Sequence, residues 1–232
     1  GILLSFIFSF SYILWKFSIV PKFNFDNHLF SLIPSIPPLL LIHSSYYLFV
    51  MTDRFFVTFL NTGDISALTY ATVLTYAIPQ LLSVATYFLT AYSEEKLILE
   101  KNRKFNEAIS LVILIGLPTT IFFALTGNTI ISLLLERGAF NSNNSLLVSN
   151  ILSVLCLAII PLCIQPALDQ IYQAEKRFRK IIFIKFSVFL LNIILNWVLI
   201  FYLNFGVIGA ALATVISYWI MLLLCFADIR SF

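Results

Sequence analysis

The sequence predicts an all-α membrane protein, a bundle of helices that crosses the bilayer several times. Of its 232 residues, 60% are hydrophobic and 11% are charged, whereas a soluble domain carries about a quarter charged residues. The apolar residues gather in stretches, most of them near the roughly 20 residues that a helix needs to cross a bilayer. No stretch shows the alternation over about ten residues that is typical of membrane β-strands.

The apolar stretches set the expected order of the helices. Residues 1–18 begin inside an apolar run without Met, and we interpret them as the end of a truncated membrane helix of a longer protein. Residues 19–31 follow as a cytoplasmic loop, and residues 32–232 hold six complete membrane helices. These helices are expected at 32–60, 64–92, 106–134, 146–171, 182–203 and 207–227.

The charges between the helices predict the orientation. Lys and Arg are frequent in residues 94–104 and 175–185, and such residues accumulate in cytoplasmic loops. The alternate loops carry a single cation between them, Arg137, and are expected outside. They are residues 61–64, 136–144 and 202–206. The pattern predicts a multi-pass protein of a cytoplasmic membrane.

Asp53 and Arg54 are the charged pair that lies well within an expected span, about two turns from its outer end. An unpaired charge in the membrane costs at least roughly 2.5–3.5 kcal/mol, so an ionisable residue there is a functional-site hypothesis. Adjacent residues of a helix point about 100° apart. One of the two could therefore face a cavity while the other meets another helix. In the alternative, Arg54 extends to the outer surface and Asp53 pairs with it.

Glu136 and Arg137 stand at the outer end of an apolar run, followed by Gly138 and a block of Asn and Ser. One interpretation is a mutually paired cap at headgroup depth, with Gly138 ending the helix. The other is a direct contact between Arg137 and a substrate.

Prolines crowd several expected helices. Pro79, Pro118, Pro161 and Pro166 are expected to interrupt them, and such breaks persist in a bilayer where neighbouring helices or a water-filled cavity satisfy the freed backbone groups. They predict either a cavity with moving helices, in which Pro79 and Pro118 act as hinges, or kinks fixed by packing. Asp169, near the cytoplasmic end of its span, either lines an inner gate or caps its helix near the headgroups.

Asn192 and Asn196 are four residues apart and share one helix face. Two amides in a membrane need hydrogen-bond partners, so this face is expected to meet protein. The small residues that follow predict a close helix crossing after a tight external turn. They are Gly206, Gly209, Ala210, Ala211 and Ala213.

The sequence contains no motif for chemistry on a substrate. The two histidines and three cysteines lack metal-ligand spacing, and neither a glycine-rich phosphate loop nor a nucleophile elbow occurs. We expect no metal site, no cofactor, no nucleic-acid partner and no enzymatic activity.

Four stretches, in this order and spacing, resemble a known family: GDISALTYA (63–71), LLLERGAF (133–140), ALDQIYQA (167–174) and LNIILNWVLIFYLNFGVIGAALAT (191–214). They are similar to the MurJ/MviN family of lipid II flippases, within the exporters of multidrug, oligosaccharidyl-lipid and polysaccharide cargo. The resemblance covers nearly the whole chain and matches the end of the sixth helix and helices seven to twelve.

The resemblance implies one lobe, the C-terminal one, of a two-lobed, V-shaped transporter that works by alternating access in the bacterial cytoplasmic membrane. The implied cargo is an undecaprenyl-pyrophosphate-linked peptidoglycan precursor, contacted by Arg54, Asp53 and Arg137. An N-terminal lobe would complete the cavity. An ion gradient or the membrane potential would supply the energy, since no nucleotide site occurs.

Two departures from the family pattern concern the cargo. The family's YA is followed by an Asp-Arg pair, or at least an Arg, whereas this chain has Thr72 and Val73, and no Lys or Arg lies between Arg54 and Lys96. The basic loop after Tyr172 reads EKRFRK in place of the family's Asp-Thr-x-Thr-Pro.

These departures keep other functions open. One is export of another polyprenyl-linked oligosaccharide or of a drug. A second is a non-transporting remnant or a scaffold for wall-synthesis enzymes. A membrane glycosyltransferase is disfavoured, because Asp53 and Asp169 are expected at opposite faces of the membrane and cannot form one site.

Overall fold

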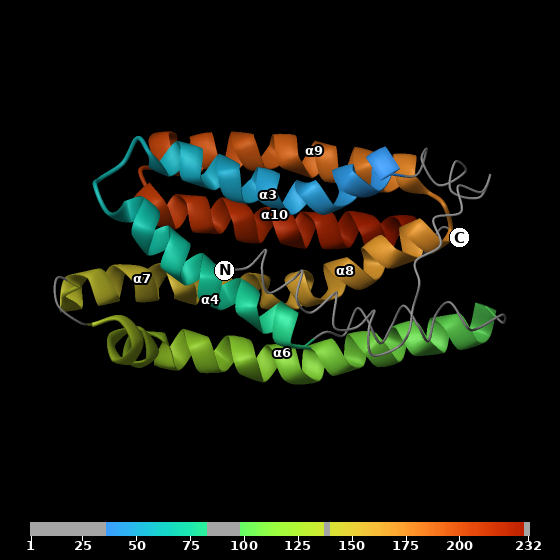
Figure 1. Ribbon diagram of the computed structural model, residues 1–232, viewed down its shortest axis with the longest axis horizontal. Helices are drawn as coiled ribbons and strands as arrows, with labels where there is room; N and C mark the ends of the chain where they lie inside the picture. The colour runs from blue at the N-terminus through green and yellow to red at the C-terminus, as the bar shows by residue number, and fades with distance from the viewer. Residues whose placement is uncertain (1–35, 83–97, 137–139, 230–232) are drawn as a thin grey trace, which may run out of the picture. The chain divides into compact units, whose positions relative to one another are not determined.

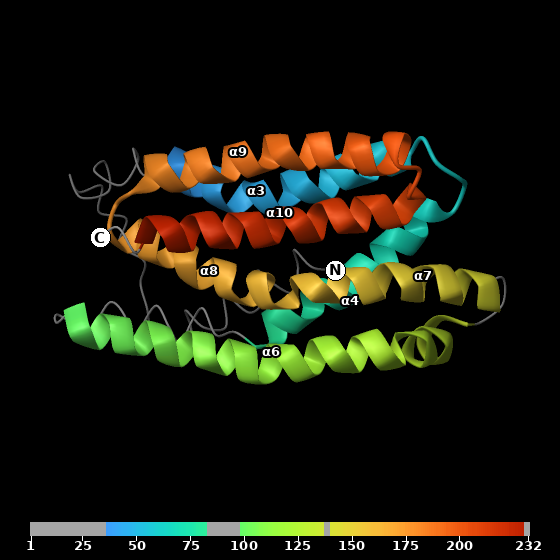
Figure 2. The ribbon, with the colours of Figure 1, turned by 180° about the vertical axis from the view of Figure 1, so that it is seen from behind.

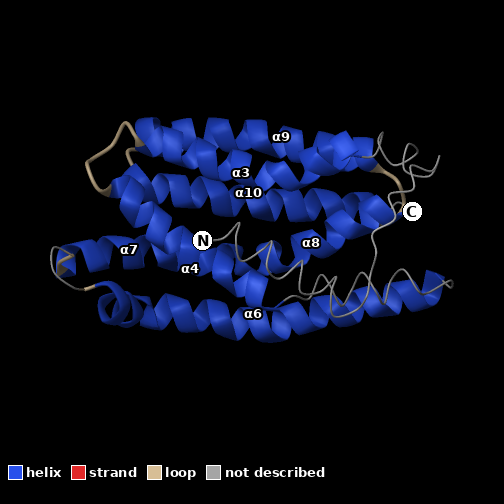
Figure 3. Cartoon of the chain, viewed as in Figure 1, coloured by secondary structure: helices blue, strands red, loops and turns tan. Residues whose placement is uncertain are grey.

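Helices make up nearly all of the part of the chain that the computed structural model describes, residues 36–82, 98–136 and 140–229, and no strand occurs within these ranges. Figure 3 shows helices throughout these ranges, with short loops between some of them. An all-α fold is therefore confirmed. The expected helix end at 1–18 and loop at 19–31 lie outside the described residues.

Contacts divide the chain into two units, Gly1–Pro37 and Pro38–Phe232, and the following description concerns the second. Short elements join some of its helices: η2, a 3₁₀ turn (Cys156–Ala158), links α7 to α8, and η3, a π-helical turn (Val198–Tyr202), extends α9. The longer helices are α3 (Ile36–Val57), α4 (Asp64–Leu82), α6 (Ile98–Leu135), α7 (Ser142–Leu155), α8 (Ile159–Ala174), α9 (Phe178–Trp197) and α10 (Gly206–Ile229).

Successive spans run in opposite directions (Figures 1 and 2). The start of α6, the end of α8 and the start of α9 lie at one end of the bundle. This end therefore gathers the basic residues of α6 and of the α8–α9 connection, as the predicted topology requires. Residues 94–97 of the first basic segment lie outside the described residues.

Four described segments are long and apolar enough to cross a membrane, and they confirm a polytopic membrane bundle. They are Arg103–Leu135, Ser142–Ala174, Phe178–Tyr202 and Gly206–Ile229. Helices α3 and α4 correspond to the expected spans at 32–60 and 64–92, but neither reaches this measure, so a total of six crossings stays a prediction.

The burial of each helix reflects its place in the bundle. Helix α10 packs against α4, α7, α8 and α9, and small residues on its buried face allow this close approach. Helix α6 lies at the edge (Figure 1) and exposes large apolar side chains, with Leu125 exposed by 80%. Such a surface suits lipid, because a soluble protein rarely exposes so large an apolar patch.

The expectation that prolines interrupt the helices is wrong at three positions. Helices α4, α6 and α8 continue through Pro79, Pro118 and Pro166. Pro37 and Pro38 stand in the first turn of α3, where the N–H groups have no helical partner and proline is tolerated. The hinge role of Pro79 and Pro118 stays a prediction.

A change of helix type does occur just before Pro161, at η2 between α7 and α8. Proline has no N–H, so the carbonyl of Leu157, four residues earlier, loses its usual partner. The indole Nε1–H of Trp219 on α10 donates to this carbonyl at 2.9 Å. A neighbouring helix thus satisfies the freed group, as the membrane requires.

The predicted close crossing is found where η3 meets α10. A Cβ atom added at Gly209 would lie 3.0 Å from the carbonyl carbon of Leu199 and 3.1 Å from its oxygen. Gly206 has a φ of 55°, in the left-handed region that favours glycine. The close backbone contact between η3 and α10 therefore depends on Gly209. The turn that precedes α10 depends on Gly206.

We expect Gly209→Ala to destabilise the protein by about 1–3 kcal/mol, because the added methyl group meets backbone that cannot rotate away. The measurement is thermal unfolding of the purified protein in detergent. Gly127→Ala is the matched control, since the nearest atom to its added Cβ would be a leucine methyl at 3.6 Å. Equal unfolding temperatures for the two variants would contradict the close crossing.

Candidate functional site

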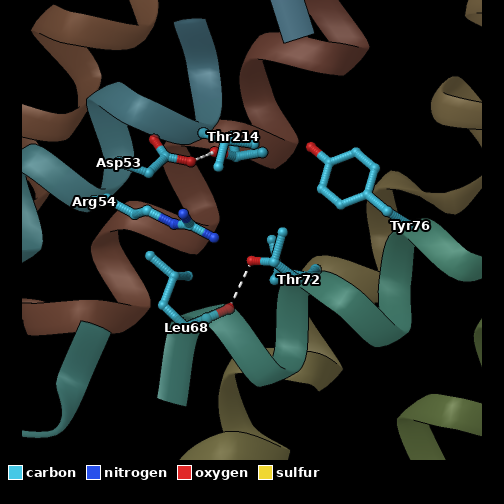
Figure 4. Close-up of a pocket in the computed structure, with 8 residues that line it drawn as sticks. Asp53, Arg54, Leu68, Thr72, Tyr76 and Thr214 are labelled. Carbon is cyan, nitrogen blue, oxygen red and sulfur yellow. Dashed lines mark hydrogen bonds between the residues drawn. The ribbon is translucent and has the colours of Figure 1, made fainter. Parts of the chain in front are cut away.

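A pocket lies between α3 and α4, with further lining from α7 and α10 (Figure 4). Its empty volume of about 280 Å³ includes open solvent, so it is a partly open recess with little enclosed space. Such a recess can contact one chemical group of a larger ligand. The lining residues are Val50, Asp53, Arg54, Leu68, Thr72, Tyr76, Leu155 and Thr214.

Asp53 is buried at the inner side of this pocket and is held by two other helices. The side-chain amide of Asn196 on α9 donates to its Oδ1 at 2.8 Å. The hydroxyl of Thr214 on α10 donates to its Oδ2 (Figure 4). Both donors are neutral, so these bonds orient the carboxylate without balancing a negative charge.

The amide pair on α9 confirms the predicted inward face. Asn192 and Asn196 are both fully buried. Besides Asp53, the Nδ2 of Asn196 lies 3.1 Å from the backbone oxygen of Asn192 and 3.2 Å from its Oδ1. Their contact with α3 through Asp53 was not predicted, because it joins residues 143 positions apart.

Arg54 does not pair with Asp53 in the described part of the chain. Both carboxylate oxygens of Asp53 accept bonds from α9 and α10, while the exposed guanidinium of Arg54 extends into the pocket (Figure 4). The alternative in which the two residues form a pair is therefore wrong. The pocket receives a cation that no described carboxylate neutralises.

The two positions at which the family pattern has Asp-Arg differ in their surroundings. Thr72 lines the pocket opposite Arg54 and donates from Oγ1 to the backbone oxygen of Leu68 at 2.6 Å. Val73 is 61% exposed and does not line the pocket. Among the described residues that line the pocket, Arg54 is thus the cation that could replace the arginine of the family pattern.

Asp169 belongs to a second polar cluster, in the half of the bundle that holds the α8–α9 connection. Its Oδ2 lies 2.7 Å from the Nζ of Lys185, and the Nε2 of Gln165 donates to its Oδ1 at 3.0 Å. Lys185 also donates to the backbone oxygen of Ile42 at 2.9 Å. The interpretation of Asp169 as a cap near the headgroups is therefore wrong, and a role in an inner gate stays a prediction.

Lys185 was counted with the basic segment 175–185, which overlaps the expected helix at 182–203, and the structure places it within the bundle, because its side chain is 6% exposed. A signal for its burial was present in the sequence. Asn192 and Asn196 follow Lys185 by seven and by eleven residues, so all three share one face of a helix. A lysine in register with two buried amides is expected inside the bundle.

The two polar clusters lie along the same helices, separated by apolar side chains. Eleven residues separate one cluster from the other on each helix: Ile42 from Asp53 on α3, and Lys185 from Asn196 on α9. At 1.5 Å per residue this spacing is about 16 Å. Between them the ring of Phe49 packs 5.5 Å from that of Tyr218. The cluster around Asp53 and the cluster around Asp169 are therefore distinct sites. We call them the outer and the inner cluster.

The outer end of α6 is described in part. Glu136 is exposed, and the hydroxyl of Ser145 lies 3.5 Å from its Oε2. Arg137 and Gly138 lie outside the described residues. In the polar block that follows, Asn141 caps α7, since the N–H of Asn144 donates to its side-chain oxygen at 3.1 Å.

The described residues include no group of three or more His, Cys, Asp and Glu side chains that could hold a metal ion. All three cysteines, Cys156, Cys163 and Cys225, are free and buried.

A family model described as "Lipid II flippase MurJ" matches residues 1–230. The chain belongs to the MurJ family. The resemblance found in the sequence motifs is thereby confirmed.

Curated MurJ relatives are similar along much of the chain. A probable lipid II flippase MurJ of Aquifex aeolicus (strain VF5) is 26% identical over 201 residues, which cover 85% of this chain and 40% of the relative. A lipid II flippase MurJ of Thermosipho africanus (strain TCF52B) is 30% identical over 150 residues, which cover 65% of this chain and 31% of the relative. The chain thus spans less than half the length of these relatives.

Solved structures show the same fold. A structure of lipid II flippase MurJ in an inward closed conformation matches 95% of this chain and 47% of its own, with a TM-score of 0.74 and 26% identity. An outward-facing multidrug resistance MATE transporter of the MOP superfamily matches with a TM-score of 0.69 at 19% identity, over 81% of this chain and 42% of its own. The MATE likeness concerns the fold alone.

Proposed function

We propose that this chain is the C-terminal lobe of a flippase that moves the lipid-linked peptidoglycan precursor lipid II across the bacterial cytoplasmic membrane by alternating access. Membership of the MurJ family supports the cargo class. The match to a MurJ structure, which covers 47% of that structure's chain, supports one lobe that works with an N-terminal lobe. The polyprenyl tail would stay in lipid while the polar head passes through a cavity between the lobes.

The observation that carries this proposal is the guanidinium of Arg54, which extends into a pocket between α3 and α4. A cation on a membrane-spanning helix is costly unless a partner compensates it. Guanidinium binds phosphate oxygens through two parallel hydrogen bonds. The pyrophosphate of the cargo supplies such a partner, and Thr72 across the pocket offers a hydroxyl beside it.

Replacement experiments in cells test this proposal. We expect the complete polypeptide that contains this chain to restore growth to a bacterium depleted of its lipid II flippase, and to restore externally accessible lipid II. The measurement is labelling of lipid II at the outer surface. Accumulation of lipid II inside, at normal levels of the protein in the membrane, would exclude this cargo.

A second candidate is export of another polyprenyl-linked oligosaccharide, and Val73 in place of the family's cation favours it. Its cargo would still present a phosphate to Arg54. Failure to move lipid II, together with transfer of a different labelled glycolipid by the same purified protein, would select this function.

Asp53 is the proposed point at which the energy of an ion gradient enters. Its carboxylate is 7% exposed and accepts bonds only from neutral donors among the described residues. A buried carboxylate in this setting is stabilised by a proton or by a small cation. Loading and release of that ion would change the contacts that Asp53 makes with α9 and α10, and would thereby favour one conformation of the lobe.

We expect Asp53→Asn to remove the dependence of transport on a proton or sodium gradient while the protein stays folded, because the amide oxygen can still accept a hydrogen bond. The measurement is lipid II transfer in proteoliposomes with and without each gradient. Asp64→Asn is the matched control, as Asp64 is equally buried but lies outside the pocket. Unchanged gradient dependence in Asp53→Asn would place coupling elsewhere.

A further inference from the structure

Three tyrosines form a continuous aromatic surface that borders the pocket. The rings of Tyr46 and Tyr47 on α3 lie 5.0 Å apart at 72°, and those of Tyr46 and Tyr76 on α4 lie 4.7 Å apart at 78°. Tyr76 lines the pocket (Figure 4), and its hydroxyl lies 3.1 Å from that of Tyr218 on α10. These edge-to-face contacts hold the rings in fixed orientations.

The depth of this surface is unusual for tyrosine. Helix α3, an expected membrane span, runs from Ile36 to Val57, so Tyr46 and Tyr47 stand at the midpoint of that expected span. Membrane tyrosines concentrate at the two interfaces with water, where the hydroxyl is hydrated. Tyr47 is 63% exposed, and among the described residues its hydroxyl has no hydrogen-bond partner. A hydroxyl at mid-depth that faced hydrocarbon would be unsatisfied, so Tyr47 is expected to face a polar cavity.

Helix geometry places Tyr47 in register with Arg54. The two residues are seven positions apart, so they point within about 20° of each other and lie about 10 Å apart along α3. Val50, which lines the pocket, stands between them. Tyr47 itself does not line the pocket, and its exposed ring lies on the same face of α3 as the guanidinium, next to the pocket.

The cargo chemistry fits this arrangement. In a polyprenyl-diphosphate glycan the first sugar is bonded directly to the diphosphate. A diphosphate held by Arg54 therefore brings that sugar to the adjoining part of α3. A sugar ring presents C–H groups on its faces and hydroxyls at its edge, whereas tyrosine presents an apolar ring and a polar hydroxyl.

We propose that Tyr47, held in place by Tyr46 and Tyr76, binds the saccharide that adjoins the diphosphate of the cargo. This inference rests on the proposed function of Arg54 and adds a glycan subsite beside it. Arg54 would recognise the diphosphate of any such lipid, and Tyr47 would distinguish a lipid that carries a sugar from one that does not.

The test compares two probes, lipid II and undecaprenyl diphosphate, on the complete polypeptide in lipid nanodiscs. We expect Tyr47→Ala to weaken lipid II binding about tenfold, equivalent to about 1.4 kcal/mol, and to leave undecaprenyl diphosphate binding unchanged. Tyr47→Leu keeps an apolar side chain but removes the ring and the hydroxyl, and should give the same selective loss. Phe55→Ala is the matched control, because Phe55 is 60% exposed on α3 and does not line the pocket.

Each other outcome overturns the inference in a distinct way. Unchanged lipid II binding by Tyr47→Ala removes the glycan subsite and leaves the diphosphate site intact. An equal loss for both lipids, or recovery in Tyr47→Leu, assigns Tyr47 to the prenyl chain or to the fold. If the parent protein binds neither lipid, the proposed function fails, and the glycan subsite fails with it.

Discussion

Arg54→Ala is expected to abolish lipid II transport, whereas Arg54→Lys retains part of it. The guanidinium of Arg54 extends into the pocket without a carboxylate partner among the described residues. With the cargo bound, the diphosphate would be the partner of Arg54, and removing one member of a buried, hydrogen-bonded charge pair costs about 2–5 kcal/mol. Lysine keeps the charge but offers a single ammonium in place of a planar fork, so its loss should be intermediate.

Transfer of lipid II in proteoliposomes measures this effect, with the folded amount of each variant checked by gel filtration. Arg103→Ala is the control, because Arg103 lies near the start of α6 with its side chain 61% exposed and pairs with Glu107. It should transport at the rate of the parent. An Arg54→Ala variant that equals the parent would remove Arg54 from the site.

Breaking the inner ion pair is the second change for which a large effect is expected. Asp169→Asn and Lys185→Met should each destabilise the protein by about 3–5 kcal/mol, because each leaves one buried charge without its partner. The double variant should recover most of this loss, since both charges are then removed. Thermal unfolding in detergent gives the four stabilities of the cycle.

The same cycle tests the predicted gate. A double variant that is stable but does not transport lipid II would support a gating role for Asp169, whereas full transport would leave the pair with a structural role. Lys180→Met is a suitable control, because Lys180 is 48% exposed and its partner Asp228 keeps contacts with Arg177 and Tyr172. Additive losses in the double variant would contradict the pairing of Asp169 with Lys185.

The sequence identified Asp53 as a candidate residue, but it did not predict the partners of Asp53 or of Lys185. Asp53 was recognised as a functional candidate from its place in an apolar run, yet its partners Asn196 and Thr214 lie 143 and 161 positions away. Lys185 was counted with the basic segment 175–185 because Lys and Arg accumulate in cytoplasmic loops. Its ion pair with Asp169 becomes visible only when α8 and α9 are packed together.

The sequence by itself determined the membrane class, the helical fold, the family and the alternation of the basic segments. These follow from properties that add up along one helix, namely hydropathy, the spacing of small and polar residues, and the charge at each end. Only the tertiary structure decided which charges are paired, which proline breaks a helix and which residues share a pocket. Those outcomes depend on the side chains that neighbouring helices bring to the same place, such as Trp219 beside the carbonyl of Leu157.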